Sequence, residues 1–408
     1  MASVPTLVIQ KFGGTSVADP DRIREVADHV ARTQRHGNDV VVVVSAMGKE
    51  TDQLIKLAHE VSDVRPGREM DMLITAGERK AMALLCMALH SLGIDADSFT
   101  GSQAGFITDT AHTNAKILEL RPDRIRCALD QGRVPVVGGS QGVSLERDVT
   151  FLGRGGSDTT AVALAHALDA SVCELYTDVS GLFTADPRLV PGARRMGLVS
   201  FDELLEMTAT GCPKPAMRAV EYARRWGVTL HVRSAFTWEP GTWVKEEDPS
   251  MEQAIVSAVT HDVSEAKVTV SGVPDKPGIA AQMFRELADR DVNVDMIVQN
   301  VSEDGVTDIS FTVPKGHLSS ATEVCTALAE EIGATGVSSD HDIARVSIVG
   351  AGMKSNPGVA ATMFETLANN GINIEMISTS AIRTSCVVRE DQIEEAVAAL
   401  HAVFELGQ

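Results

Sequence analysis

The carboxyl-terminal part of the chain contains an internal repeat. Residues 266–300 (AKVTVSGVPDKPGIAAQMFRELADRDVNVDMIVQN) match residues 344–380 (ARVSIVGAGMKSNPGVAATMFETLANNGINIEMISTS). The correspondences, all at one constant offset, are Pro277-Gly278 with Pro357-Gly358, Met283-Phe284 with Met363-Phe364, and Asn293 with Asn373. A repeat constrains the fold strongly, because each copy must form the same supersecondary unit.

Each copy has the pattern of a small α+β module. A β-branched strand is followed by a Pro-Gly turn, an amphipathic helix and a second strand, then by a third strand (308–313 and 385–389) and another helix. This order is the βαββαβ plan of ferredoxin-like domains. We therefore expect two such modules, at 264–338 and 341–408, paired edge to edge.

The preceding residues alternate between strand-like and helix-like segments. Expected strands lie at 7–10, 39–45, 134–137 and 172–177, and expected helices at 22–33, 70–92 and 160–168. The segment 39–45 (DVVVVVS) is apolar on both faces, as in a central strand covered by helices. This alternation predicts an α/β domain with a mostly parallel sheet between helices, at 1–248. Residues 238–250, with Pro, Gly and a charged run, resemble a boundary linker.

Composition narrows the class of partner. The 408 residues carry a net charge of −20, which argues against nucleic acid or an anionic membrane as the main partner. The six cysteines are scattered without metal-ligand or redox spacing, and the histidines show no paired ligand spacing. No signal peptide is evident, and the apolar runs are too short to span a membrane. We expect a cytoplasmic protein without a metal site built from its own side chains.

The segment 152–160 (LGRGGSDTT) is the strongest functional signal in the first domain. Its glycines allow close approach to a ligand, and the helix start that follows offers free N–H groups to an anion. Arg154 can bind a carboxylate through two parallel hydrogen bonds. The segment therefore predicts a site for an anionic ligand.

Two further loops follow expected strands. Residues 11–16 (KFGGTS) place a lysine beside paired glycines, which suits contact with phosphate. Taken alone, the segment favours a solvated lysine in a glycine turn, and the phosphate interpretation gains weight only from the other glycine segment. These residues match neither the Walker spacing nor the dinucleotide fingerprint. Residues 177–188 (TDVSGLFTADPR) form either an ordinary turn or a nucleotide-holding loop at the carboxyl ends of parallel strands. Lys214, between Pro213 and Pro215, is either a displayed phosphate ligand or a loop lysine in water.

Taken together, the motifs resemble the aspartate kinase family. The resemblance rests on KFGGTSVAD (11–19), VVVVSAMG (41–48), TAGER (75–79), LGRGGSDTTAVALA (152–165), TADPR (184–188) and the DKPG/NPG repeat, in order along the whole chain. It implies an amino-acid kinase (carbamate-kinase-like) fold followed by two ACT regulatory domains. It also implies transfer of the γ-phosphoryl group of ATP, with Mg²⁺, to the β-carboxylate of L-aspartate. The product, 4-phospho-L-aspartate, leads to lysine, threonine and methionine.

The resemblance also implies residue roles. Lys11, Arg154, Asp158 and Lys214 would be catalytic, with Asp158 orienting the lysines. ATP would contact Lys11, Phe12, Gly13, Gly14, Ser157, Thr177, Asp178, Phe183, Asp186 and Arg188. Aspartate would contact Ser45, Thr51, Glu78, Arg154, Gly155, Gly156 and Ser157. The carboxylate nucleophile is already ionised at neutral pH, so no general base is needed.

For the repeat, the resemblance implies feedback regulation by lysine, threonine or both, and a homo-oligomer formed through the ACT domains. Effector contacts would be made by Asp275, Pro277, Gly278, Ile279, Ala280, Asn293, Val294, Asp295, Gln299, Val359, Ala360, Asn373, Ile374 and Ser380. A structural reading of the Pro-Gly turns, as simple chain reversals, stands beside this one.

The chain departs from the family pattern at several positions. Ser140 stands where an aromatic residue is usual, Lys214 is displaced by one position from the family's second lysine, and Ser180 and Ala381 replace acidic residues. These departures leave two alternatives open: a kinase of the same fold for another acid, and a degenerate kinase that acts as an amino-acid sensor.

Overall fold

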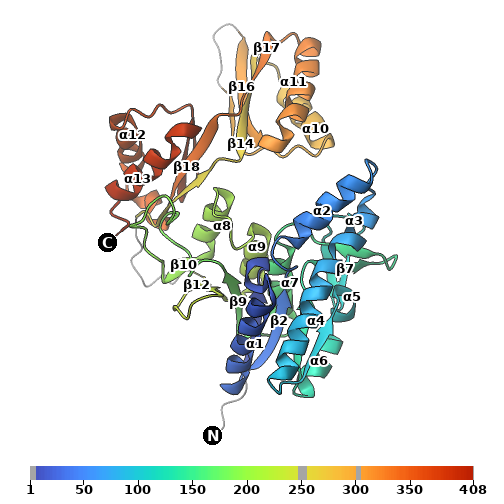
Figure 1. Ribbon diagram of the computed structural model, residues 1–408. Helices are drawn as coiled ribbons and strands as arrows, with labels where there is room; N and C mark the ends of the chain where they lie inside the picture. The colour runs from blue at the N-terminus through green and yellow to red at the C-terminus, as the bar shows by residue number, and fades with distance from the viewer. Residues whose placement is uncertain (1–5, 247–254, 300–304, 408) are drawn as a thin grey trace. The chain divides into compact units, whose positions relative to one another are not determined.

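The computed structural model describes residues 6–246, 255–299 and 305–407 (Figure 1). Their contacts separate the chain into two compact units. The first contains residues 1–182, 195–208 and 213–251, and the second contains 183–194, 209–212 and 252–408. The expected boundary at 248 therefore needs correction, because two short segments of the expected first domain pack within the second unit. Ala185 and Val190, for example, are buried in a core of the second unit.

The first unit is built on an eight-stranded sheet with the order β10-β12-β11-β9-β1-β2-β6-β3. Neighbouring strands are parallel except β11 and β12, which confirms the mostly parallel sheet. The strands are β1 (Leu7–Phe12), β2 (Asp39–Val44), β3 (Ala96–Phe99), β6 (Val134–Gly138), β9 (Val172–Thr177), β10 (Leu198–Ser200), β11 (Leu230–Ser234) and β12 (Thr242–Lys245).

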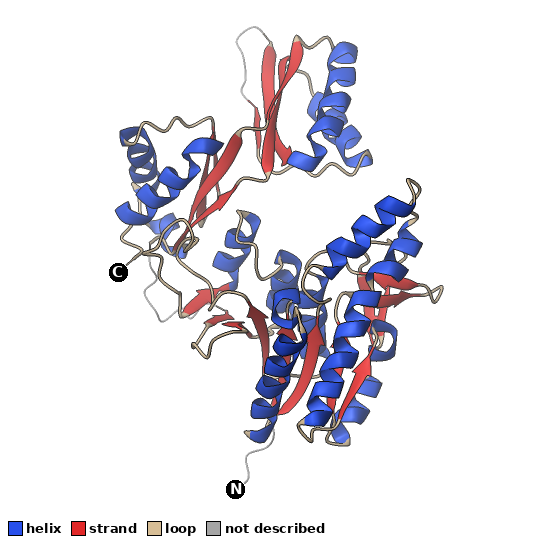
Figure 2. Cartoon of the chain, viewed as in Figure 1, coloured by secondary structure: helices blue, strands red, loops and turns tan. Residues whose placement is uncertain are grey.

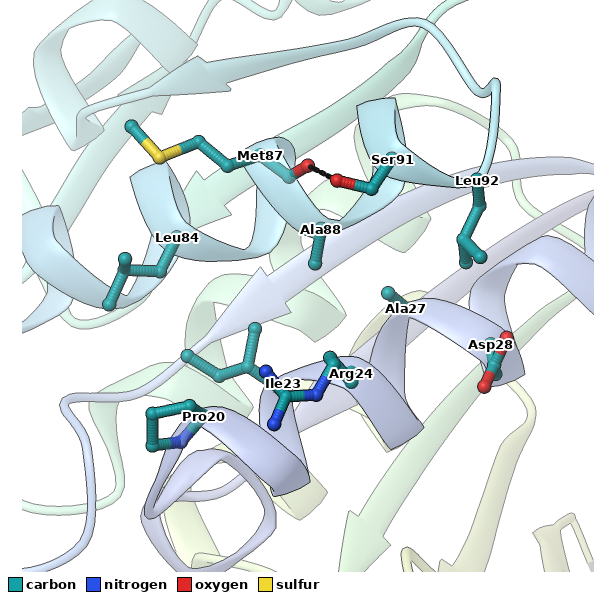
Figure 3. Close-up of a pocket in the computed structure, with 10 residues that line it drawn as sticks. All are labelled: Pro20, Ile23, Arg24, Ala27, Asp28, Leu84, Met87, Ala88, Ser91 and Leu92. Carbon is teal, nitrogen blue, oxygen red and sulfur yellow. Dashed lines mark hydrogen bonds between the residues drawn. The ribbon is translucent and has the colours of Figure 1, made fainter.

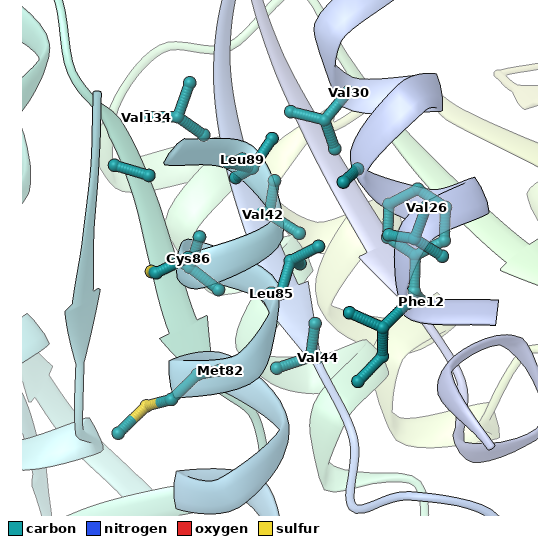
Figure 4. Packing of buried hydrophobic residues seen from close by; sticks show 14 of the residues in the cluster. Phe12, Val26, Val30, Val42, Val44, Met82, Leu85, Cys86, Leu89 and Val134 are labelled. Carbon is teal, nitrogen blue, oxygen red and sulfur yellow. The ribbon is translucent and has the colours of Figure 1, made fainter. Parts of the chain in front are cut away.

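Helices cover both faces of this sheet. On one face, α1 (Pro20–Arg35) and α4 (Ala76–Ser91) pack onto β1, β2 and β6, and their apolar side chains meet Phe12, Val42 and Val44 (Figure 4). On the other face, α7 (Gly156–Ala167) lies against β1, β2 and β9. Because side chains alternate along a strand, Phe12 points toward α1, and Lys11 points toward α7.

The remaining elements of the first unit include a second, four-stranded sheet with the order β5-β4-β7-β8. Its strands are β4 (Phe106–Thr108), β5 (Ile117–Leu120), β7 (Gln141–Ser144) and β8 (Val149–Phe151). The other helices are η1 (Gly14–Val17), α2 (Glu50–Val61), α3 (Gly67–Ile74), α5 (Gly101–Ala104), α6 (Asp123–Asp130), α8 (Phe201–Ala209) and α9 (Met217–Trp226). No described helix is long and apolar enough to cross a membrane.

Two expectations for this unit are wrong in detail. The single helix expected at 70–92 is divided into α3 and α4 at Thr75, whose carbonyl oxygen accepts a hydrogen bond from Gln141 Nε2 at 2.9 Å. The linker expected at 238–250 contains β12, an internal strand of the large sheet, with alternating buried and exposed residues. The charged run that follows β12 concealed this alternation, and residues 247–250 lie outside the described part.

The second unit contains two four-stranded antiparallel sheets, each with its helices on one face (Figure 2). The first module has the order β15-β16-β14-β17, from β14 (Glu265–Pro274), α10 (Ile279–Asp289), β15 (Ile297–Gln299), β16 (Val306–Pro314), η2 (Lys315–His317), α11 (Leu318–Ile332) and β17 (Gly336–Asp340). The second has the order β13-β18-β20-β19, from β13 (Ala258–Asp262), β18 (Ile343–Val349), η3 (Ala351–Ser355), α12 (Val359–Asn369), β19 (Met376–Thr379), β20 (Arg383–Arg389), η4 (Glu390–Gln392) and α13 (Ile393–Val403).

The second module obtains its fourth strand from an unexpected place. The strand β13 precedes the first module in sequence, yet it pairs with β18 from Ala258–Val349 to Asp262–Arg345. The first module is thus inserted between two parts of the second. The expected boundaries at 264 and 341 leave β13 outside both modules, whereas in the structure β13 is a strand of the second module's sheet.

Candidate active site

A buried ion pair joins the first strand to the glycine-rich helix start. Lys11 Nζ at the end of β1 lies 2.6 Å from Asp158 Oδ1 in the first turn of α7, and the two side chains are 8% and 7% exposed. Asp158 Oδ2 also accepts a hydrogen bond from the backbone N–H of Ala216 at 3.0 Å. The structure thus brings together two of the four residues predicted to be catalytic, and it holds the loop around residue 216 beside them.

Of the two glycines after Lys11, Gly14 is required by close packing. A Cβ atom on Gly14 would lie 2.8 Å from the carbonyl oxygen of Gly48 and 2.9 Å from that of Ala46. At Gly13, a Cβ atom would lie 3.6 Å from Lys11 Nζ. The absence of a side chain therefore leaves space directly beside the lysine ammonium group, which suits a phosphate oxygen.

Three serines meet at the start of α7. Ser45, after β2, donates a hydrogen bond to Ser157 Oγ at 3.0 Å, and Ser140 Oγ lies 3.0 Å from the same atom. Gly155 precedes the helix with a φ of +73°, in the left-handed region that favours glycine. A Cβ atom on Gly156 would lie 2.9 Å from Ser140 Oγ. Ser45 and Ser157 were both predicted to contact substrate, and the structure places them in direct contact with each other.

Glu78 is buried in the first turn of α4. Its side chain is almost inaccessible, and its Oε2 atom has no hydrogen-bond partner among the described residues. Burial raises the pKa of this carboxyl group to about 7, although hydrogen bonds from its surroundings, including one from Gln141, oppose the shift. An unpartnered buried carboxyl group is suited to receive a cationic group from a ligand.

Gln141 was not among the predicted site residues, although its neighbour Ser140 was noted as a departure from the family pattern. It fixes the break before α4 through Thr75 and also contacts Glu78. The signal that could have identified it is a polar residue at the start of an otherwise buried strand.

Arg154 lies at the surface. Its side chain is 91% exposed, and its Nη2 atom lies 3.3 Å from Asp52 Oδ1 in the first turn of α2. Thr51, another predicted substrate contact, is the neighbour of Asp52 in sequence. An exposed guanidinium with one weak partner can exchange that partner for a ligand carboxylate at little cost.

Within the part of the chain that the structure describes, Lys214 forms an ion pair with Asp178 rather than with Asp158. Its Nζ atom lies 3.6 Å from Asp178 Oδ1, and both side chains are about half exposed. Asp158 instead contacts this loop through the backbone of Ala216. Asp158 was predicted to orient the lysines. It forms an ion pair with Lys11, whereas the ion pair described for Lys214 is with Asp178.

The other predicted nucleotide-binding residues, apart from Lys11, the glycines after it and Ser157, fall into three groups. Thr177, at the end of β9, donates a hydrogen bond to the carbonyl oxygen of Val179 at 3.0 Å, beside Asp178. The side chain of Phe12 is buried and stacked on Tyr176 with ring centroids 4.6 Å apart, which leaves its backbone for the predicted contact with ATP. Phe183, Asp186 and Arg188 belong to the second unit, where Arg188 pairs with Asp186 through two hydrogen-bonding nitrogens.

The predicted effector residues occupy equivalent places in the two modules. Gly278 and Gly358 precede α10 and α12 with φ values of +104° and +102°, and among the described residues neither helix start has a side-chain cap. Asp295, before β15, pairs with Arg345 on β18. The remaining predicted effector residues lie at the helix starts or in and beside β15 and β19: Asp275, Pro277, Ile279, Ala280, Asn293, Val294, Gln299, Val359, Ala360, Asn373, Ile374 and Ser380.

Two surface depressions in the first unit are lined by none of the predicted site residues. One, of about 350 Å³, is an apolar groove between α1 and α4 (Figure 3). The other, of about 520 Å³, is lined by β5, the end of α7 and α9. Within the described residues, no three His, Cys, Asp or Glu side chains are grouped as a metal site would require.

Comparison with known proteins agrees with this arrangement. Residues 6–234 match the amino acid kinase family, and residues 268–328 and 346–404 match the ACT domain. The aspartokinase of Mycolicibacterium smegmatis is 57% identical over 98% of this chain and 96% of its own length. The chain belongs to the aspartokinase family. The aspartate kinase of Pseudomonas fluorescens is 49% identical, with 98% of both chains covered.

Solved structures agree with the aspartokinase assignment. E. coli aspartokinase III, in complex with aspartate and ADP, has a TM-score of 0.82 and 25% identity, and the match covers 97% of this chain and 99% of that one. This member of the aspartokinase family is therefore an ATP-dependent phosphotransferase.

Proposed function

We propose that this protein transfers the γ-phosphoryl group of ATP to the β-carboxylate of L-aspartate and so forms 4-phospho-L-aspartate. The observation that carries this proposal is the buried Lys11–Asp158 pair beside the open backbone at Gly13. Phosphoryl transfer requires alignment and charge neutralisation more than covalent chemistry, and the site supplies both. The likeness to an aspartokinase that binds aspartate and ADP supports the choice of substrates.

The phosphate side of the site is assigned to the end of β1. Lys11 would neutralise charge on the transferring group, and Asp158 would keep its ammonium group in place. Gly13 and Gly14 would bring backbone close to the phosphate oxygens. Mg²⁺ would enter with the nucleotide phosphates and supply further charge neutralisation. Thr177 and Asp178 would contact the nucleotide at the end of β9, and Lys214 would reach it by releasing Asp178.

The aspartate side is assigned to Glu78, Arg154 and the serines. Glu78 would bind the substrate ammonium group, because its Oε2 atom is buried and unpartnered. Arg154 would exchange Asp52 for the α-carboxylate. Ser45 and Ser157 would lie where aspartate meets ATP. The β-carboxylate attacks the γ-phosphorus, the bond to the bridging oxygen of ADP breaks, and no proton needs to be removed.

Regulation by amino acids is assigned to the second unit. We infer that the module helix starts after Gly278 and Gly358 receive the carboxylate of lysine, threonine or both. The product of the kinase reaction, 4-phospho-L-aspartate, would enter the pathways to lysine, threonine and methionine.

Trapping the acyl phosphate with hydroxylamine tests this function. The purified protein, incubated with MgATP, L-aspartate and hydroxylamine, should form aspartyl hydroxamate, whereas Lys11→Ala should form at least about 10²-fold less. The same assay with L-glutamate, N-acetyl-L-glutamate and carbamate tests a kinase for another acid. Absence of hydroxamate with aspartate would refute the proposal, and binding of lysine or threonine without turnover would support a sensor instead.

A further inference from the structure

Arg345 is an arginine buried between the two modules of the second unit. It lies on β18 with a side chain that is 2% exposed. Its Nη1 atom pairs with Asp295 of the first module, and its Nη2 atom donates a hydrogen bond to the carbonyl oxygen of Ala209 at 2.9 Å. The same Nη2 atom lies 3.0 Å from Glu265 Oε1. One planar guanidinium therefore joins a predicted effector residue to the end of α8.

The segment after Ala209 is fixed to the second module by two more contacts. Thr210 Oγ1 lies 2.6 Å from Thr260 Oγ1 on β13. Gly211, with a φ of +115°, passes so close to β13 that a Cβ atom there would lie 1.8 Å from the carbonyl oxygen of His261. The backbone of this segment therefore follows any movement of β13 or Arg345.

This segment leads directly to Lys214. Only Cys212 and Pro213 separate Gly211 from Lys214 in sequence, and proline restricts the backbone between them. A displacement at Ala209 therefore passes along the chain to the lysine that we assign to the nucleotide.

The charges around Arg345 are not balanced. Asp262, Glu265 and Asp295 supply three carboxylates to one guanidinium. Burial raises the pKa of Glu265 to about 7, and the charges of Asp295 and Asp262 add to the shift while Arg345 opposes it. Among the described residues, Arg345 Nε and Glu265 Oε2 have no hydrogen-bond partner. Such a cluster is sensitive to the loss of one partner, because an uncompensated buried charge is costly.

Asp295 is the partner that a solute can reach, since its side chain is 41% exposed. We propose that Arg345 is a positioning residue that couples amino-acid binding at Asp295 to the position of Lys214. An effector ammonium group that pairs with Asp295 competes with Arg345 for the carboxylate. When Arg345 loses this partner, its guanidinium moves and displaces the carbonyl group of Ala209 to which it is hydrogen-bonded. The segment 209–213 then carries this displacement to Lys214. This inference rests on the proposed function, specifically on the assignment of Asp295 to the effector site.

Arg345→Lys tests the coupling while retaining a positive charge. A lysine cannot bridge Asp295 and Ala209 with two fixed donors as the guanidinium does. With L-lysine and L-threonine as probes, singly and together, we expect unchanged basal hydroxamate formation, and calorimetry should show that the variant still binds the effector. The ratio of uninhibited to fully inhibited rate should fall about fivefold or more, the lower range of allosteric coupling.

Arg389→Lys is the matched control. Arg389 also joins the modules, through Asp340 at 2.6 Å and Glu375 at 3.5 Å, but within the described part of the chain it forms no hydrogen bond or ion pair with the segment 209–212. This variant should keep full inhibition. Equal inhibition of Arg345→Lys and the parental protein would overturn the coupling, as would equal loss of inhibition in both variants.

Hydrogen exchange of the unaltered protein gives a second test that does not depend on the stability of a variant. Saturating effector should change the exchange of the amides at 210–212, and unchanged exchange in an inhibited protein would overturn the coupling. If the parental protein forms aspartyl hydroxamate but responds to neither probe, the regulatory part of the proposed function fails and this inference fails with it. If the parental protein is inhibited and Arg345→Lys is inhibited equally, only this inference fails.

Discussion

Lys11 and Asp158 form an ion pair that is almost completely removed from solvent, at 2.6 Å between β1 and α7. A buried pair of this kind holds its ammonium group in one position, but it does so at a high desolvation cost. The pair therefore indicates positioning of charge for chemistry rather than a contribution to stability alone.

Asp158→Asn should separate these two roles. We expect kcat to fall by about 10²–10³-fold, because the ammonium group of Lys11 loses its anchor, and stability to fall by about 3–5 kcal/mol, because a buried charge loses its partner. The matched control is Lys80→Ala, which breaks an equally short pair with Glu50 at 2.6 Å in which the lysine is half exposed. Lys80→Ala should lower the free energy of unfolding by less than about 1 kcal/mol. Hydroxamate kinetics and urea unfolding measure both effects, and a wild-type kcat in Asp158→Asn would contradict the assignment.

Gly14→Ala should displace the loop after β1. The added methyl group would lie 2.8 Å from the Gly48 carbonyl oxygen, and backbone cannot move aside as a flexible side chain can. We expect a loss of about 1–3 kcal/mol in stability and a rise in the KM for ATP. Gly197→Ala is the control, because no neighbouring heavy atom of the described residues lies within 4 Å of its added methyl group. Similar effects of the two substitutions would show that the loop tolerates the insertion.

Glu78 should make aspartate binding depend on pH near neutrality. Its pKa is raised to about 7 by burial, so the carboxylate that would bind an ammonium group becomes populated only as pH rises through this value. We therefore expect the KM for aspartate to fall between pH 6 and pH 8, while the KM of Glu78→Gln should be high and flat. A pH-independent KM in the parental protein would remove Glu78 from the substrate site.

The same group should affect the stability of the unliganded protein in the opposite sense. Between pH 4.5 and about pH 7 the folded state binds this proton more tightly than the unfolded state does, so the contribution of Glu78 to stability declines as pH rises across that range. Thermal unfolding of Glu78→Gln should not show this decline.

A buried network on the α1 face of the sheet should make the first unit sensitive to acid. Burial lowers the pKa of His29 to about 4, so its contribution to stability is lost as pH falls from 6.5 toward 4. Burial alone would raise the pKa of Glu174, but hydrogen bonds from His231, Gln10 and Tyr176 and the charge of Arg233 lower it to about 2. Its contribution is lost as pH falls from 4.5 toward 2.

Glu174→Gln should therefore make the unfolding temperature less dependent on pH below 4.5. The same variant should be less stable than the parental protein at neutral pH. Glu25→Gln, which removes a half-exposed partner of Arg22, should leave that dependence unchanged. An unaltered acid profile in Glu174→Gln would show that the network does not control acid unfolding.

Local patterns predicted the central elements well. The run of valines in β2 and the segment 172–177 of β9 are apolar enough to identify strands of a covered sheet, and the glycine motif at 152–160 identified the start of α7. These features depend on neighbouring residues, so a single sequence contains the information.

Features that depend on distant partners were not predictable in the same way. The break at Thr75 depends on a hydrogen bond from Gln141, and the core position of Phe12 depends on Tyr176. Arg345 is an ordinary strand residue in sequence, and its importance arises from Asp295 and Ala209, which lie far from it in the chain. Non-local contacts of this kind give no signal in local periodicity.

The position of β13 has a consequence for how the protein is made. This strand leaves the ribosome before the whole first module, yet its partner β18 is synthesised only afterwards. The nascent chain must therefore carry an unpaired strand edge while the intervening module folds, and such edges favour aggregation. Rapid folding of the inserted module, whose strand β14 contacts β18, would shorten that exposure. Substitutions that slow the first module would then reduce the yield of soluble protein even where they leave the finished fold intact.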